Sequence, residues 1–378
     1  IAQDPALAEM EAAFLSIPMR TGQPYKQWQK GTDCELMKKA NSWRVDKLRK
    51  IVVMQGDANF CNKQIAYKTA RRGETPLPNG KYDRLAREQA GSRKRHRAIE
   101  QALNKRLTFD LLRQLKWPGI MVPNDLKSCY DRICHSIASL CMRRQGVSEA
   151  EVVFTFTLIQ NLEHEIRTAY GDSDKTYGGE IWVIPMQGVY QGNGGGPTIW
   201  AVVSSPLLQI MKEEGFGTFF KASITNDIIR IVGYAFVDDT DLIQTGKDGS
   251  ESSLEVLQQM QEGINLWEGL VSATGGAIEV AKSTWWLIDF IWDNDGQWRY
   301  ATKEDIPADL FVKDVSGERR TIPRLETSEA FATLGVHLGP DGSQLAAYEH
   351  LLETAKTWAD KLRTSFLKEQ EANAALKT

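Results

Sequence analysis

The stretch that decides the fold is IVGYAFVDDTDLIQTG, residues 231–246. Two apolar runs rich in β-branched and aromatic residues, 231–237 and 242–245, flank the adjacent carboxylates Asp238 and Asp239. This pattern predicts a β-hairpin with both aspartates at its tip. A hairpin turn usually contains Asn-Gly or Asp-Gly, because these residues adopt positive φ at low cost. Two aspartates at this place therefore indicate something other than a plain turn.

Two other stretches of the chain show what a plain turn looks like. Residues 290–300 (FIWDNDGQWRY) and 331–345 (FATLGVHLGPDGSQL) both predict hairpins, and each contains Asp-Gly at its expected turn. Adjacent like charges beside buried strands cost free energy unless a cation or hydrogen-bond donors neutralise them. Mg²⁺ prefers carboxylate oxygens as ligands. The sequence therefore predicts a divalent cation at the tip of the 231–246 hairpin.

A third carboxylate is expected from residues 118–133, PGIMVPNDLKSCYDRI. An extended apolar run leads into Asp125, and a helix is predicted soon after it. A two-metal phosphoryl-transfer site uses carboxylates to bridge ions about 3.5–4 Å apart. We therefore expect Asp125 to lie beside the aspartate pair of the hairpin. The alternative role for Asp125 is a helix N-cap, which aspartate also favours.

The bulk composition is that of an ordinary soluble globular protein. The chain has 378 residues, of which 42% are hydrophobic and 25% charged, and this length suits two or three subdomains. No apolar run is long enough to cross a bilayer, so no membrane partner is expected. Five cysteines form no CxxC pair, which argues against a disulfide scaffold or a zinc site and indicates a reducing, intracellular compartment.

Charge is divided unevenly along the chain. Residues 1–150 contain 28 Lys and Arg against 15 Asp and Glu, whereas the remaining residues contain 18 against 34. The two parts therefore carry +13 and −16, which sum to the net charge of −3. This asymmetry weakly indicates that the first part holds a polyanion. Solvated helix faces that happen to differ in charge explain it equally well.

Strands and helices are mixed without a regular βαβ alternation, which predicts an α+β fold. Helices are predicted over residues 1–50, over a basic stretch from about residue 82 to 115, near 252–271 and from about 345 onward. A further buried helix is predicted to begin at Pro197, because proline suits the first helical turn.

Six segments occur in the order of the signature motifs of reverse transcriptases. They are EQAGSRKRHRAI (88–99), NDLKSCYDR (124–132), MQGVYQGNGGGPTIWAVVSSPLL (186–208), YAFVDDTDL (234–242), GGAIEVAKSTWWL (275–287) and FATLGVHLGPDGS (331–343). They resemble, in turn, the Gln-x-Gly-Phe-Arg fingers motif, the first palm motif, the Pro-Gln-Gly loop and helix, the aromatic-x-Asp-Asp hairpin, the lysine-bearing fourth motif and the Leu-Gly hairpin that grips the primer. From about residue 85 to 345 the chain resembles the reverse transcriptase of non-LTR (LINE-type) retrotransposons.

The resemblance implies a right-hand polymerase fold with fingers, a palm made of an antiparallel sheet backed by helices, and the start of a thumb. The implied divisions are an N-terminal helical extension (1–50), fingers (51–116), a palm (117–345) with a fingers insertion at about 148–186, and the start of the thumb (346–378). Because the chain begins with Ile1, we expect it to be an excerpt of a longer protein.

The resemblance also implies roles in a metal site. Asp125 and Asp238 would be the principal ligands of two Mg²⁺ ions, for which Mn²⁺ can substitute. Asp239 would assist them, and Leu126 would lend its backbone carbonyl. Asp241 is expected to be structural instead, because it does not occupy a ligand position of the family.

Further implied roles concern the nucleotide and the template. The residues implied to bind the incoming nucleotide are Arg93, Lys94, Leu126, Tyr130, Gln191, Gly192 and Lys282. Among them, Arg93 would clasp the triphosphate, Tyr130 would exclude a 2′-hydroxyl, and Lys282 would act as general acid to the departing pyrophosphate. A solvated basic face that touches template phosphates would contain Arg95, Arg97, Lys105 and Arg106.

The implied activity is template-directed DNA synthesis from deoxynucleoside triphosphates on an RNA or DNA template with a primer, and family analogy adds the nucleus as compartment. Two alternatives stay open. An RNA-dependent RNA polymerase is disfavoured by the bulky Tyr130, and a decayed remnant that only binds nucleic acid is disfavoured by the intact aspartates. Details of the nucleotide pocket also stay open, because Tyr190 and Ser92 replace a proline and a phenylalanine of the family pattern.

Overall fold

The predicted hairpin is present in the structure. Strand β9 (Gly233–Phe236) pairs antiparallel with strand β10 (Asp239–Thr245), and Asp239 lies opposite Phe236. Val237 and Asp238 therefore form the two-residue turn. Strand β10 is buried from its second residue to its end, so the aspartates stand at the point where a buried strand emerges.

The hairpin belongs to the central sheet of an α+β fold, as the sequence predicts. The computed structural model describes residues 4–38, 44, 48–76, 84–179, 187–368, 370–371 and 374. The strand order of this sheet is β16–β11–β3–β10–β9. Its other members are β3 (Gly119–Asn124), β11 (Trp285–Ile288) and β16 (Arg324–Leu325).

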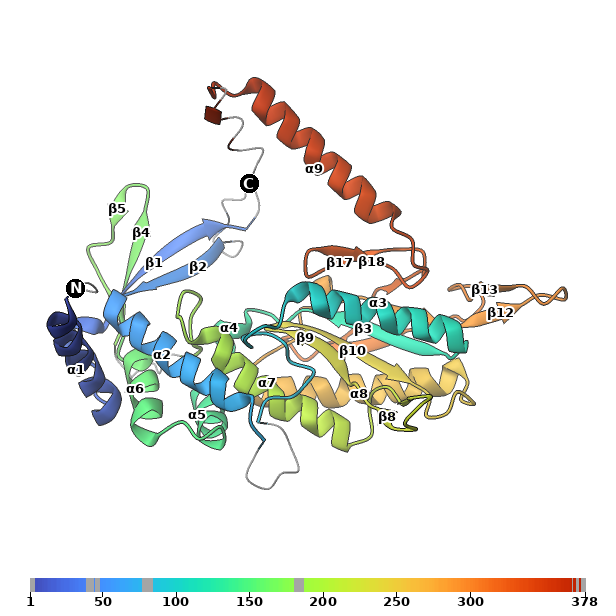
Figure 1. Ribbon diagram of the computed structural model, residues 1–378, viewed down its shortest axis with the longest axis horizontal. Helices are drawn as coiled ribbons and strands as arrows, with labels where there is room; N and C mark the ends of the chain where they lie inside the picture. The colour runs from blue at the N-terminus through green and yellow to red at the C-terminus, as the bar shows by residue number, and fades with distance from the viewer. Residues whose placement is uncertain are drawn as a thin grey trace.

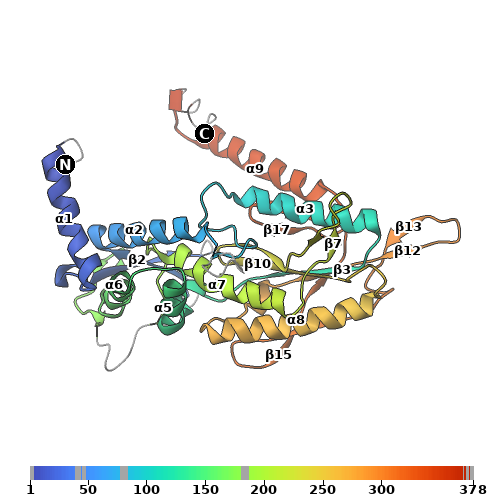
Figure 2. The same cartoon turned by 60° about the horizontal axis from the view of Figure 1, so that its bottom comes forward.

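Strand β3 lies in the middle of the sheet and pairs antiparallel with both β10 and β11. All its residues are buried, which agrees with the apolar run over 120–123. Helix α8 (Ser253–Ala273) covers one face of the sheet, and helix α3 (Ala98–Leu115) lies over the other (Figures 1 and 2). Packing between these two helices holds the sheet, and with it the strand ends that carry the aspartates, in position.

A second sheet joins segments that are distant in the chain, in the order β2–β1–β4–β5, with β6 pairing to β4. Its strands are β1 (Lys30–Met37), β2 (Leu48–Met54), β4 (Glu163–Thr168), β5 (Gly171–Asp172) and β6 (Tyr177–Gly178). The predicted helical extension over residues 1–50 is therefore wrong beyond helix α1 (Pro5–Thr21). The inward positions of β1 are Gly31 and Asp33, so the apolar alternation that predicts a strand is missing there.

The remaining helices surround these sheets. They are α2 (Gly56–Gly73), α4 (Cys129–Arg132), α5 (His135–Arg144), α6 (Glu149–Gln160), α7 (Gly196–Glu213) and α9 (Leu345–Thr364), with single 3₁₀ turns η1 (Lys26–Trp28) and η3 (Val280–Lys282). Helix α9 extends away from the body of the molecule (Figure 1), and none of its residues is buried. Within the described residues, no helix has the length and apolar character needed to cross a membrane.

Most helix starts agree with the sequence signals. Helix α7 has Pro197 in its first turn, and α8 follows a capping box in which Ser252 and Glu255 each accept a hydrogen bond from the backbone N–H of the other. The basic helix predicted from about residue 82 begins later, at Ala98, and residues 84–97 form turns and bends. Residue 82 and residues 180–186, the end of the predicted fingers insertion, lie outside the described part of the chain.

Short hairpins complete the fold. Strands β12 (Phe290–Trp292) and β13 (Trp298–Tyr300) confirm the hairpin with an Asp-Gly turn. The hairpin of β17 (Phe331–Thr333) and β18 (Val336–Leu338) is also present, but its predicted Asp-Gly turn is wrong. Its turn is Leu334-Gly335, and both residues have positive φ, as a tight type I′ turn requires. Two further hairpins pair β7 (Phe220–Lys221) with β8 (Ile228–Ile229) and β14 (Leu310–Lys313) with β15 (Arg319–Ile322).

Candidate active site

The strand register brings the three expected carboxylates to one end of the central sheet. Asn124, the last residue of β3, lies opposite Thr240 of β10. Asp125 therefore leaves β3 at the same end at which β10 begins with Asp239, and Asp238 occupies the adjoining turn. Because β3 and β10 are antiparallel neighbours, their pairing alone brings Asp125 close to Asp238 and Asp239, which are distant from it in the chain.

The three carboxylates interact electrostatically. Burial, followed by the charges of Asp238, Asp241 and Asp125, raises the pKa of Asp239 to about 6, while Lys105 opposes this rise. Burial and the charge of Asp125 also raise the pKa of Asp238. The site therefore concentrates negative charge that its surroundings neutralise only in part.

A cation of the chain itself lies against this acidic end. The ammonium of Lys282, the last residue of the η3 turn, forms an ion pair with the carboxylate of Asp125. The backbone holds this contact in place, because the N–H of Glu279 donates to the carbonyl of Asp125 at 2.8 Å. Leu126, the implied carbonyl ligand, is buried, and its backbone forms an antiparallel bridge with Ile278.

The chemistry of these donors suits a hard divalent cation, since carboxylate oxygens are the ligands that Mg²⁺ prefers. Across the described residues, no three Asp, Glu, His or Cys side chains are arranged as a ready metal site. The ammonium of Lys282 is paired with one oxygen, Oδ2, of the Asp125 carboxylate. A cation bound by all three aspartates would meet Lys282 at that carboxylate.

A cavity of about 310 Å³ opens beside Asp238. Its lining comes from strand β2, helix α4, the loop before α7, helix α7 and the hairpin turn: Arg49, Tyr130, Tyr190, Gln191, Gly192, Asn193, Pro197 and Asp238. Tyr130, Gln191 and Gly192 of the expected nucleotide site are thus brought together next to an expected metal ligand. Burial, and next the charge of Asp238, raises the pKa of Tyr130, so this phenol stays neutral.

The loop that carries Gln191 and Gly192 is fixed by strand β2. The N–H of Val52 donates to the carbonyl of Gln191 at 2.8 Å. Gly192 has φ of 107°, and a Cβ atom there would stand 2.3 Å from the carbonyl oxygen of Val52. Only glycine therefore allows the loop to approach β2 this closely.

Arg49 is a member of this cavity that the sequence analysis missed. It lies on the exposed side of β2, and its positive charge lowers the pKa of Asp238. The apolar run Ile51–Met54 covers only the end of this strand. The start of the strand is charged, and its partner β1 gives no apolar signal, so nothing in the sequence placed Arg49 near the aspartates.

Arg93, the expected triphosphate ligand, is engaged elsewhere. Its guanidinium makes two hydrogen bonds to the carboxylate of Glu74, at 2.7 and 3.0 Å, and a weaker one to the carbonyl of Ala86 at 3.4 Å. It does not line the cavity beside Asp238. Its role with the triphosphate stays a prediction that requires the pair with Glu74 to open. Lys94 is exposed to solvent.

A second cavity, of about 150 Å³, lies on the other side of the aspartate pair. It is lined by Asp125, Asp239, Asp241 and Lys282 and by the β17–β18 turn. Behind it, the ammonium of Lys105 forms a buried ion pair with Asp241 and donates to the hydroxyl of Thr333 at 2.6 Å. Lys105 is 1% exposed, so its expected place on a solvated, phosphate-binding face is wrong.

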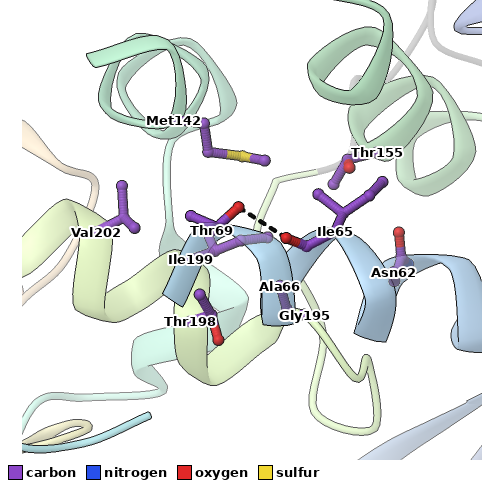
Figure 3. A pocket seen from close by; sticks show the side chains of 10 residues that line it. All are labelled: Asn62, Ile65, Ala66, Thr69, Met142, Thr155, Gly195, Thr198, Ile199 and Val202. Carbon is purple, nitrogen blue, oxygen red and sulfur yellow. Dashed lines mark hydrogen bonds between the residues drawn. The ribbon is translucent and has the colours of Figure 1, made fainter. Parts of the chain in front are cut away.

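One more cavity lies between helices α2, α5, α6 and α7 (Figure 3). It is lined mainly by apolar groups such as Ile65, Met142 and Ile199, and the space open to the centre of a water molecule is about 10 Å³. This volume holds about one water molecule. The cavity includes none of the expected site residues and is a small packing gap instead of a ligand site.

Neither a protein-family model nor a curated protein matches this chain. Among solved structures, it is similar to telomerase from Candida tropicalis in complex with a TWJ fragment of telomeric RNA, with 15% identity and a TM-score of 0.44 over 74% of this chain and 44% of that chain. Apo telomerase from Candida tropicalis gives 14% identity and a TM-score of 0.44 over 84% of this chain and 52% of that chain. Telomerase from Candida albicans, again with a TWJ fragment of telomeric RNA, gives 12% identity and a TM-score of 0.43 over 82% of this chain and 50% of that chain. The chain thus spans about half the length of these telomerases, and so distant a likeness assigns it no function.

Proposed function

We propose that this protein is a template-directed polymerase that adds deoxynucleotides to a primer by two-metal nucleotidyl transfer. The observation that carries the proposal is the meeting of Asp125, Asp238 and Asp239 at one end of the central sheet, where burial and the charge of Asp125 raise the pKa of Asp238 and of Asp239. Mutually repelling carboxylates at a partly buried strand end destabilise a fold. Groups perturbed in this way are typical of functional sites.

The proposed metal ligands are Asp125 and Asp238, with Asp239 assisting and the carbonyl of Leu126 completing the set. Two Mg²⁺ or Mn²⁺ ions bound there would supply Lewis acidity to the primer 3′-hydroxyl and neutralise charge on the triphosphate. Lys282, once released from Asp125, would donate a proton toward the departing pyrophosphate. The ion pair seen between Lys282 and Asp125 supports this role, since it keeps the ammonium next to the acidic end of the sheet.

The cavity beside Asp238 is the proposed site of the incoming nucleotide. Arg49 would hold the triphosphate, because guanidinium matches phosphate oxygens in a bidentate manner. Tyr130 would lie against the sugar, and Gln191 with Gly192 would approach the base and template. The common lining of this cavity by Arg49, Tyr130 and Gln191 supports the assignment.

The finer part of the proposal is an RNA-directed DNA polymerase of the non-LTR retrotransposon kind. It is supported by the order of the six motif-like segments. Three of them, 124–132, 186–208 and 234–242, contribute to the cavity beside Asp238, and a fourth, 275–287, supplies Lys282. The excess of Lys and Arg in residues 1–150 supports a nucleic-acid template as partner.

Primer extension tests the proposal. On poly(rA)/oligo(dT) with dTTP and Mg²⁺, the wild-type protein is expected to extend the primer, whereas Asp238→Asn is expected to leave only background incorporation. Asp174→Asn makes the same chemical change at an exposed position outside both cavities and is expected to extend like the wild type. Equal extension by the wild type and Asp238→Asn, or none by the wild type, contradicts the proposal; nucleic-acid binding without extension indicates a decayed remnant.

A further inference from the structure

The turn between β9 and β10 contains a residue in an uncommon backbone conformation. Val237 has φ of 58°, in the left-handed region that β-branched residues rarely adopt. Such a conformation persists only where the surrounding structure holds it. Asp238 follows directly, so the backbone of Val237 sets the direction in which Asp238 leaves strand β9.

One buried side chain binds both backbone polar groups of Val237. The carboxamide oxygen of Gln89 accepts a hydrogen bond from the N–H of Val237 at 3.0 Å, and its nitrogen donates to the carbonyl of Val237 at 3.0 Å. The same carboxamide accepts from the N–H of Gly91 at 2.9 Å and donates to the hydroxyl of Ser204 at 3.0 Å. Gln89 is 0% exposed, and its bonds to Gly91 and Ser204 are fully buried, which fixes the carboxamide where it meets the partly buried Val237.

The surroundings of Gln89 fix it against the hairpin. The N–H of Ala235 donates to the carbonyl of Glu88, and the N–H of Ala90 donates to the carbonyl of Ala235, so residues 88–90 run along β9 as a further edge. The indole of Trp200 on helix α7 adds a bond to the carbonyl of Val237 at 2.7 Å.

Gly91 completes this packing. A Cβ atom at position 91 would stand 2.1 Å from the backbone nitrogen of Val237. Glycine is therefore the residue that lets the chain pass the turn at this distance. Gln89 and Gly91 belong to the 88–99 segment, for which the sequence predicts contacts with the triphosphate and with template phosphates but none with the hairpin turn.

We propose that Gln89 is a positioning residue that clamps Val237 in its left-handed conformation and thereby aims Asp238 and Asp239 at Asp125. The inference rests on the proposed function for its catalytic consequence, whereas the clamp itself concerns the backbone of the turn. In this assignment, residues 88–91 serve the metal-binding end of the sheet by hydrogen bonds to the backbone, without touching the substrate.

Three variants test the clamp. Gln89→Met keeps the side-chain volume and removes the carboxamide. Gln89→Met with Val237→Gly lets the turn adopt positive φ without the clamp, because glycine has no Cβ to oppose it. Gln145→Met is the matched control, since Gln145 is also fully buried and its carboxamide donates to a backbone carbonyl, that of Arg84, away from the hairpin.

We expect Gln89→Met to lower the kcat for dTMP addition about 10- to 100-fold more than Gln145→Met does, with a smaller change in the KM for dTTP. Adding Val237→Gly is expected to restore part of that kcat. A Gln89→Met loss no larger than that of the control, or a loss that Val237→Gly does not reduce, overturns the positioning role.

A readout that does not depend on activity separates this inference from the proposed function. Amide hydrogen exchange at residue 237 is expected to be slow in the wild type and in Gln145→Met and fast in Gln89→Met. Unchanged exchange in Gln89→Met overturns the clamp even if the wild type is an active polymerase. Faster exchange in a protein that extends no primer supports the clamp and counts against the proposed function alone.

Discussion

At the scale of single residues, the adjacent aspartates of the hairpin turn are the feature that needs a physical cause. Burial and the charge of Asp125 raise the pKa of both Asp238 and Asp239, and the charge of Asp238 raises the pKa of Asp239 further. The charges of Lys282 and Arg49 offset the rise in the pKa of Asp238 only in part. A turn that needed only to reverse the chain could contain glycine at a position of positive φ, as the β12–β13 turn does with Gly296 and the β17–β18 turn with Gly335.

The raised pKa of Asp239 predicts a pH effect on stability in metal-free buffer. Its carboxyl group has a pKa of about 6 in the fold, above the ordinary aspartate value of 3.8. Between about pH 4 and 6 the folded state therefore binds more protons than the unfolded state, so its stability falls as pH rises through this window. Thermal unfolding in EDTA should show a smaller fall for Asp239→Asn than for the wild type. Because part of Asp239 is open to solvent, screening makes the effect small. Parallel stability curves for the two proteins would contradict the prediction.

The ring of Tyr130 is expected to select deoxyribonucleotides over ribonucleotides. Its ring lies in the wall of the cavity beside Asp238, and a Cβ atom on Gly196 of helix α7 would come within 3.6 Å of it. Tyr130→Ala is expected to reduce the preference for dTTP over UTP, as the ratio of kcat/KM values, by about ten-fold or more. Tyr130→Phe keeps the ring and serves as the control. An unchanged ratio in Tyr130→Ala would rule out the ring as a sugar gate.

At the scale of secondary-structure elements, helix α3 shows why composition alone misplaces a charge. The many Lys and Arg residues of this stretch predict a basic helix with a solvated face. Its buried positions include Gln101, Lys105, Phe109 and Leu112, which recur with helical periodicity and face the sheet. That periodicity places Lys105 on the inner face, and the fold supplies Asp241 as its partner.

Removing this lysine is expected to destabilise the protein strongly. Lys105→Met leaves the carboxylate of Asp241 buried without its cation, which costs about 3–5 kcal/mol. Combining Lys105→Met with Asp241→Leu removes both charges and is expected to recover most of that loss. Urea denaturation measures both free energies of unfolding, with the exposed Lys63→Met as control. If Lys105→Met lowers the free energy of unfolding no more than Lys63→Met does, a structural role of the Lys105–Asp241 ion pair is contradicted.

The elements that could be predicted are those with local signals. Helices α7, α8 and α9 begin where Pro197, the Ser252 capping box and an amphipathic run place them. Strand β1 could not be predicted, because its buried positions hold Gly31 and Asp33, whose partners come from distant strands. Turns were predictable only in part, since a Leu-Gly pair took the place of the Asp-Gly expected between β17 and β18.

At the scale of the whole molecule, the candidate site lies where the two sheets approach each other. The hydrogen bond from Val52 of β2 to Gln191 joins the sheet that carries Arg49 to the loop beside the aspartates.

Motif order predicted that Asp125, Asp238 and Tyr130 would meet, and the structure brings them to one end of the central sheet. The sequence could not predict that Arg49 and Gln89 lie near the turn, because tertiary contacts alone bring them there.

The central claim is that the acidic end of the central sheet binds divalent cations. Thermal unfolding with increasing Mg²⁺ tests it most directly, because a ligand that binds only the folded state raises Tm. Each protein is compared with itself in EDTA, since removing one repelling charge also changes the metal-free Tm. Mg²⁺ is expected to raise the Tm of the wild type and of Asp174→Asn by about 2 °C or more, and to leave Asp125→Asn and Asp238→Asn nearly unchanged. No rise in the wild type, or an equal rise in Asp238→Asn, would contradict the account.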